Sequence, residues 1–217
     1  GAKPGLEQLE VTEDPVRMYL RQIGRVPLLT AEEEKTLARS KEKKDYIKAI
    51  EEECSRKLRI PPSAIEVVTT LLERLEEALP LLQAVEEQLA LVPPQGLAKR
   101  ILNPALRAAL SRELNEQLIE AVSRRMDESR SRVEEALKEL SLNTSLLPPE
   151  LLDIVGESSP AELHDRLHAP DFLHSLKPFE ERFQKHLEGI KQRGRKAEES
   201  LVEANLRLVV SVAKKYV

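Results

Sequence analysis

The spacing of apolar residues along the chain predicts helices over nearly its whole length. The first clear set follows the i, i+3, i+4, i+7 spacing that places side chains on one helix face, and consists of Val16, Tyr19, Leu20 and Ile23. Asp14 can cap this helix and Pro15 suits its first position. Gly24 suits its C-terminal end. We therefore expect a short amphipathic helix here.

A second helix is expected to begin after Thr30. Thr30 and Glu33 have the spacing of a capping box, in which each side chain accepts a hydrogen bond from the other residue's backbone amide. The helix should continue until Pro61 and Pro62, since proline lacks the amide hydrogen that a helix interior needs. Its predicted buried stripe consists of Ile47, Ile50, Cys54 and Leu58.

The middle of the chain reads as a series of helices separated by prolines. We expect the longest helix at roughly 104–140, a loop or mobile segment at 141–159, and a weakened join to the last helix at Gly189 and Gly194. The expected divisions are a flexible lead-in (1–12), a first helical unit (13–60), a variable helical insertion (61–195) and a final helix (196–217).

Composition supports an all-α fold. The 217 residues are 41% hydrophobic and 33% charged, with no Trp, three Phe and three Tyr, so aliphatic stripes must do the packing. The single cysteine, Cys54, excludes an internal disulfide. No segment has the roughly 18 apolar residues of a membrane span or the pattern of a secretion signal, so we expect a cytoplasmic protein without membrane contact.

Charge does not by itself indicate nucleic-acid binding. The net charge is -4, so any contact with phosphate must come from a local surface. Two basic clusters qualify, one at residues 35–44 and one at 191–196, although such runs are usually solvated helix faces.

Catalytic and metal-binding patterns are weak. His164 and His168 have the i, i+4 spacing that can hold one ion, but no Glu follows the first His as in a metalloprotease motif, no Cys is near and Asp165 is the only acidic neighbour, which favours a solvated or capping pair. Cys54 shares the register of Ile47 and Ile50 and reads as a small buried residue. No phosphate loop or catalytic triad pattern is present. We expect no enzyme activity, no cofactor and no metal.

Both ends of the chain resemble one family. The stretch "DPVRMYLRQIGRVPLLTAEEEKTLARSKE", residues 14–42, resembles region 1.2 of the primary, sigma-70 family sigma factors of bacterial RNA polymerase. The stretch "AEESLVEANLRLVVSVAKKYV", residues 197–217, resembles their region 2.1. The resemblance implies that the middle is the non-conserved insertion. It also implies a transcription initiation factor that binds the clamp of the largest subunit of core RNA polymerase and the melted promoter.

The resemblance also implies DNA-contacting residues. In the family, the first helix of region 1.2 contacts the single-stranded discriminator beside the minus-ten element. The matching positions here are Arg17, Tyr19, Leu20 and Arg21. A pocket for the last, flipped-out thymine of that element would fall to Glu34, Asn205 and Leu208.

The final stretch, "VEANLRLVVSVAKKYV", is apolar nearly all round, which requires burial on several sides. We expect Leu201, Leu208 and Val212 to pack against the rest of the chain, and an apolar strip near Val217 to stay exposed or to be covered by a neighbouring molecule. We also expect the natural protein to continue. The alternative function is a helical scaffold or adaptor with no role at DNA.

Overall fold

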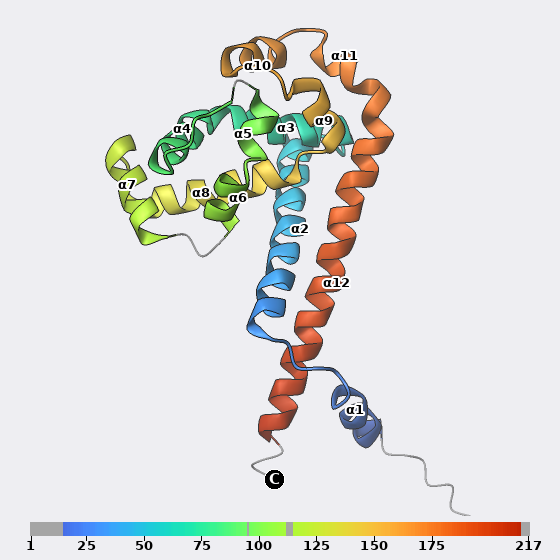
Figure 1. Ribbon diagram of the computed structural model, residues 1–217. Coiled ribbons are helices and arrows are strands. Elements are labelled where there is room, and N and C mark those ends of the chain that lie inside the picture. Colours follow the sequence, from blue (N-terminus) through green and yellow to red (C-terminus); the bar gives the residue numbers. More distant parts are fainter. Residues whose placement is uncertain (1–14, 95, 112–114, 214–217) are drawn as a thin grey trace, which may run out of the picture.

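Two long helices form a stalk that carries a head of shorter helices (Figure 1). The computed structural model describes residues 15–94, 96–111 and 115–213, and every regular element in these ranges is helical, which confirms the all-α prediction. In the stalk, α2 (Ala31–Leu58) lies beside α12 (Glu180–Ala213), and α1 (Pro15–Ile23) lies at the foot.

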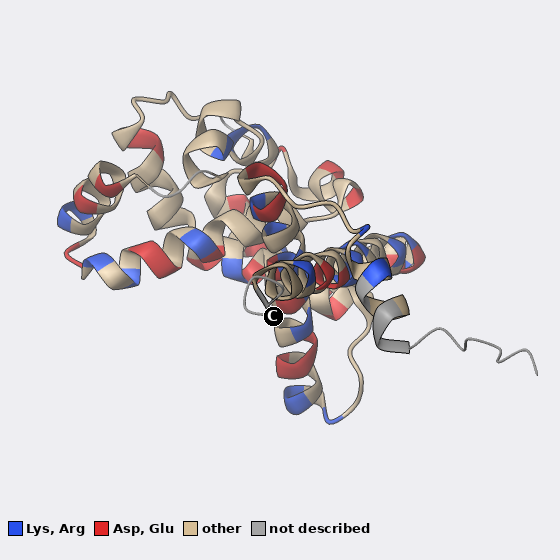
Figure 2. Ribbon diagram, turned by 90° about the horizontal axis from the view of Figure 1, so that it is seen from below, with Lys and Arg blue, Asp and Glu red and all other residues tan. Residues whose placement is uncertain are grey.

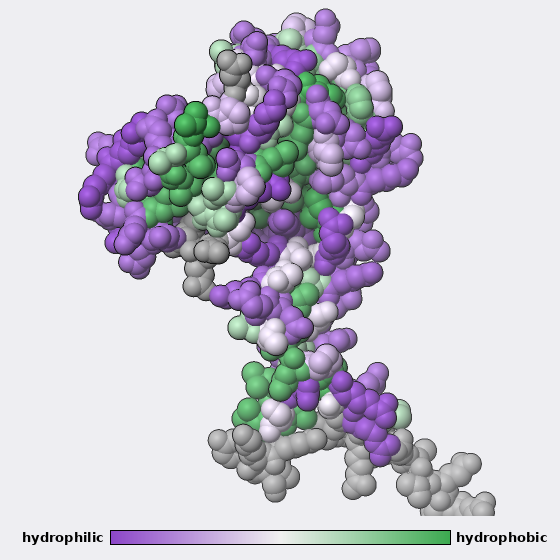
Figure 3. Space-filling view, in the orientation of Figure 1, coloured by the Kyte–Doolittle hydropathy of each residue, from purple (hydrophilic) through white to green (hydrophobic). Residues whose placement is uncertain are grey.

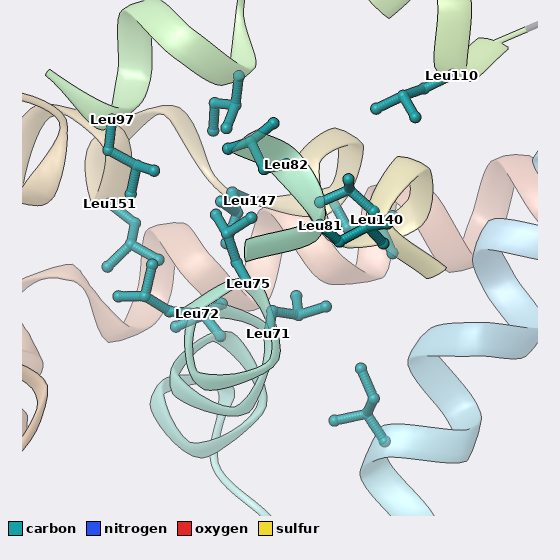
Figure 4. Close-up of a cluster of buried hydrophobic side chains, with 14 of the residues drawn as sticks. Leu71, Leu72, Leu75, Leu81, Leu82, Leu97, Leu110, Leu140, Leu147 and Leu151 are labelled. Carbon is teal, nitrogen blue, oxygen red and sulfur yellow. The ribbon is translucent and has the colours of Figure 1, made fainter. Parts of the chain in front are cut away.

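The head is built from the segment between the two stalk helices. Its elements are α3 (Ala64–Glu77), α4 (Leu79–Gln88), α5 (Leu97–Ile101), α6 (Pro104–Ser111), α7 (Glu116–Met126), α8 (Arg130–Leu146), α9 (Pro149–Val155), α10 (Pro160–Leu167), α11 (Phe172–Leu176) and the 3-10 turn η1 (Lys177–Phe179). Leucines from several of these helices converge in one core (Figure 4). The head therefore buries its own apolar surface.

Local capping sets several helix starts, among them the one predicted at Thr30. The backbone N–H of Glu33 donates to Thr30 Oγ1 at 3.2 Å, and Thr30 N–H donates to Glu33 Oε2 at 2.8 Å. The same reciprocal arrangement begins α3 at Ser63 and α10 at Ser159. Each capping box satisfies amides that a helix start leaves without partners.

The two stalk helices run antiparallel and are joined by charged and close-packed contacts. Lys44 Nζ lies 2.5 Å from Glu198 Oε2, and Lys191 Nζ lies 2.7 Å from Glu51 Oε1. Between these pairs, Gly194 of α12 lies against the backbone of Ser40 and the side chain of Lys44. This close approach requires a residue without a Cβ.

The predicted stripe of α2 is buried except at its end. Ile47 and Ile50 are fully buried and Cys54 is 6% exposed, as expected. Leu58 is 43% exposed, so the prediction was wrong there. The helix ends at this residue, and Arg59 follows in the left-handed conformation with φ of 61°. The chain thus turns away before Leu58 can reach the core.

Three predictions for the insertion and the final helix were wrong. The expected long helix at 104–140 is divided into α6, α7 and α8, because the chain reverses at Asp127 (φ 53°) and Ser129 caps a new helix. The expected loop at 141–159 contains the end of α8 and all of α9. Its Leu146, Leu151 and Val155 are fully buried.

The last helix is longer than its sequence suggests. Helix α12 continues without a break through both glycines that were expected to weaken it, so the division expected at 195–196 falls inside a helix. Packing along α2 compensates for the low helix propensity of glycine. Among the described residues, no helix is long and apolar enough to cross a membrane.

Candidate nucleic-acid interface at the foot of the stalk

Helix α1 presents polar and aromatic side chains at the foot of the stalk. Ile23 is 7% exposed and anchors the helix, which contacts α12. Tyr19 is 49% exposed, and Arg21 is also exposed. The side chains of Arg17 and Leu20 lie outside those that the structure describes. Of the four predicted discriminator contacts, Tyr19 and Arg21 are therefore placed where a ligand can reach them.

A contact that we did not predict holds the linker between α1 and α2 against α12. Arg207 Nη1 donates a hydrogen bond to the backbone carbonyl of Val26. Val26 N–H donates in turn to the carbonyl of Ile23 at 3.2 Å, so α1 and the linker are connected locally. The sequence signal for this contact was Arg207 itself, because a cation inside the apolar run 206–210 needs a nearby hydrogen-bond acceptor. Its partner could not have been identified from sequence.

The stalk register brings the three predicted thymine-contacting residues to one level. Glu34 lies ten residues before Lys44 on α2, and Leu208 lies ten residues after Glu198 on α12. Because Lys44 and Glu198 are paired across antiparallel helices, the same register places Glu34 and Leu208 at about the same level along the stalk. Asn205 shares a face with Leu208 at i, i+3. All three side chains are exposed, and Leu208 is 53% exposed.

The lower part of α12 has an exposed apolar face. Leu201 is half-buried, but Leu208 and Val212 are 53% and 46% exposed, so the predicted burial of these two was wrong. Helix α2 begins only at Ala31, and below that level just the linker and α1 accompany α12 (Figure 1). Its exposed hydrophobic side chains include Val202, Leu206, Leu208, Val209 and Val212. Figure 3 shows hydrophobic surface, in green, at the foot. Val217 lies outside the described residues.

Part of each basic cluster forms ion pairs within the stalk itself. Lys41 pairs with Asp45 at 2.7 Å, and Lys44 and Lys191 pair across the two helices. The hydrogen bond from Lys44 lowers the pKa of Glu198. Figure 2, viewed from the foot, shows positive and negative residues interspersed along the helices. The interface is therefore defined by exposed side chains and their positions more than by a large positive field.

One smaller positive site remains along the stalk. Lys43 is half-buried, and its neighbours include Arg39 on α2, Arg107 on α6 and Arg193 on α12. Burial lowers the pKa of Lys43, and the nearby guanidinium groups lower it further. Cations from three helices thus lie together between the foot and the head.

These features define an all-helical protein whose candidate ligand contacts lie at one end of an antiparallel helix pair. Residues 14–47 match the family model described as Sigma-70 factor, region 1.2. The match covers α1, the linker and more than half of α2, which include the foot of the stalk.

This match supports a sigma-70 family sigma factor fragment, and its region 1.2 segment supports a role in transcription initiation in association with RNA polymerase and promoter DNA. That family consists of transcription factors and not of enzymes. No solved structure matches the chain. The resemblance of 197–217 to region 2.1 lies outside the match and stays a prediction.

Proposed function

We propose that this chain helps direct bacterial RNA polymerase to promoters, and that the foot of its stalk contacts the melted non-template strand. The contacted DNA would be the discriminator and the downstream end of the minus-ten element. The observation that carries the proposal is the position of the region 1.2 match, which places Tyr19 and Arg21 on an exposed helix beside α12.

The side chains of α1 suit single-stranded DNA. An exposed aromatic ring can stack on a base, which contributes about 1–3 kcal/mol per base. Arginine contacts phosphate oxygens or base edges. Arg17 and Arg21 have i, i+4 spacing, which places them on one face of α1. Tyr19 has the same spacing to Ile23, which is buried toward the stalk, so Tyr19 lies on a different face from the arginines. We therefore expect a base to stack on Tyr19 while phosphates lie along the arginine side.

The opposite side of the foot suits a flipped base. A carboxylate and an amide can hydrogen-bond to the edge of a base, and an apolar side chain can pack on its face. Glu34, Asn205 and Leu208 provide these three groups at one level of the stalk, and all three are exposed. This arrangement supports their assignment to the last thymine of the minus-ten element.

The protein partner would be the clamp of the largest polymerase subunit. The exposed apolar face of α12 favours a protein contact, because soluble proteins rarely leave contiguous apolar surface uncovered. The same face would also suit the alternative function, a helical scaffold without a role at DNA. Binding to DNA separates the two functions.

The test is photocrosslinking of the chain, mixed with bacterial core RNA polymerase, to a single-stranded promoter segment with a labelled discriminator. We expect a crosslink that Tyr19→Ala and Arg21→Ala each weaken severalfold. Arg56→Ala is the matched control, since Arg56 is exposed at the opposite end of α2. A crosslink that survives both α1 substitutions would refute the proposed contact. Binding to polymerase without any crosslink to DNA would favour the scaffold.

A further inference from the structure

A second group of chemically active side chains lies in the head, far from the foot of the stalk. Glu76 of α3 lies beside His164 and His168, which come from α10 and the residue after it. One potential ligand atom from each residue lies within 4.8 Å of the other two. The structure thus adds a carboxylate to a histidine pair that sequence alone left without a third ligand.

Local structure holds the two histidines side by side. The Ser159–Glu162 capping box begins α10, and Leu163 is fully buried against the core. His164 and His168 are one turn apart, and their ring centroids are 4.3 Å apart with planes inclined by 36°. The pair therefore projects from an anchored helix, as a two-histidine metal grip requires.

The hydrogen bonds leave a metal-binding nitrogen on His168. His168 Nδ1 lies 2.9 Å from the carbonyl oxygen of His164, so Nδ1 must carry the proton and donate it. The lone pair is then on Nε2. Histidines that bind metals usually donate their other ring N–H to a carbonyl or carboxylate, which fixes the ring and its tautomer. His168 already has this arrangement.

Glu76 provides an anionic ligand at a position where it cannot move away freely. Its side chain is 18% exposed, and Oε1 lies 2.5 Å from His164 Nδ1. Glu73, one turn earlier on α3, interacts electrostatically with His168 and adds a second carboxylate to the surroundings. Negative charge beside the two imidazole rings favours a divalent cation over an empty site.

We propose that Glu76, His164 and His168 form a site for one divalent transition-metal ion, with zinc as the reference ion. Two nitrogens and one oxygen suit zinc and its neighbours better than magnesium or calcium, which prefer oxygen ligands. Tetrahedral zinc with bonds of about 2.1 Å holds its ligand atoms roughly 3.4 Å apart. The 2.5 Å distance between Glu76 Oε1 and His164 Nδ1 must widen by about 1 Å for this, which an exposed histidine ring can do by a small rotation.

The bound ion would connect two helices that are distant in sequence. His164 and Glu76 are 88 positions apart, and their hydrogen bond is one of the contacts between α10 and α3. The ion would replace this hydrogen bond by coordinate bonds and leave its fourth position to solvent, on the exposed side of the two rings. This site is independent of the DNA contact proposed at the foot.

Isothermal titration calorimetry of the tag-free chain with zinc chloride tests the site. We expect one ion per chain, with affinity at least about tenfold weaker in Glu76→Gln and stoichiometric binding lost in the His164→Ala/His168→Ala double variant. His174→Ala should bind like the parent chain, because His174 is an exposed histidine on α11 outside the group. Circular dichroism of each variant verifies its folding.

Thermal unfolding provides a second measurement. Saturating zinc should raise the midpoint of the parent chain and of His174→Ala, since a ligand that binds only the folded state stabilises it. The double variant should show no such rise. The proposal is overturned if the parent chain binds no stoichiometric zinc, in which case His164 and Glu76 form only an ion pair. Unchanged zinc binding by the double variant would overturn it equally.

Discussion

The stalk predicts that two glycines of one helix respond to alanine in opposite ways. Gly189 and Gly194 both lie inside α12, so alanine gains roughly 1 kcal/mol of helix propensity at either position. At Gly189, the nearest atom to an added Cβ is Arg193 Nη1 at 3.4 Å, the end of a flexible side chain. Gly189→Ala should therefore stabilise the protein.

At Gly194 the added carbon has no room. It would lie 2.8 Å from the backbone oxygen of Ser40 and 3.0 Å from Lys44 Cγ, with Lys44 Cβ closer still. Carbon atoms in contact are normally about 3.5–4.0 Å apart, so the approach to Lys44 Cβ requires α2 and α12 to separate by about 1 Å or more. Overpacking of this kind costs typically about 1–3 kcal/mol.

The comparison isolates the packing effect, because the gain in helix propensity cancels between the two variants. We expect Gly194→Ala to be less stable than Gly189→Ala by about 1–3 kcal/mol in urea unfolding followed by circular dichroism. In thermal unfolding this corresponds to roughly 2–12 °C for a chain of this size. Equal stability of the two variants would refute the close approach of α2 and α12 at Gly194.

Three further outcomes are expected. Arg100→Met should lower the free energy of unfolding of the head by about 3–5 kcal/mol in urea unfolding. The Glu86 side chain is only 3% exposed and would lose its two hydrogen bonds from Arg100, of 3.0 and 2.6 Å. A loss below about 1 kcal/mol would contradict this expectation. Thr30→Ala should cost about 1 kcal/mol in the same assay through loss of the cap of α2, and an unchanged midpoint would show that the cap is dispensable. Lys44 lowers the pKa of Glu198, so the stability from this pair is present above the unfolded-state pKa and is lost as pH falls through the folded-state pKa. Glu198→Gln should therefore reduce the dependence of unfolding free energy on pH below about 5, and an unaltered acid slope would exclude this contribution.

Helix starts were predictable from sequence because their causes are local. Thr30, Ser63 and Ser159 each precede a Glu by three residues, and the reciprocal hydrogen bonds form within one turn. The same holds for the α2 stripe through Ile47 and Ile50, since helical spacing alone places these side chains on one face. The family resemblance of the first segment also needed only the sequence, and the match at residues 14–47 confirms it.

Features that depend on contacts between distant segments were not predictable. Nothing near Gly194 indicates that Ser40 and Lys44 pack on it, so the glycine read as a weak point although it lies where two helices approach closely. Equally, nothing near His164 indicates Glu76. Sequence patterns report neighbours along the chain, whereas these contacts exist only after folding.

The apolar run at 206–212 separates what the sequence determines from what only the tertiary structure decides. Its sequence determined that the segment is helical and that much of its surface would be apolar. Only the tertiary structure decided which side is covered, because Leu208 stays exposed although it lies level with the first turn of α2, and Val212 lies beyond the start of α2 at Ala31. Helical periodicity assigns side chains to faces, but burial depends on which other segments reach that level of the stalk, and this is decided by the packing of the whole chain.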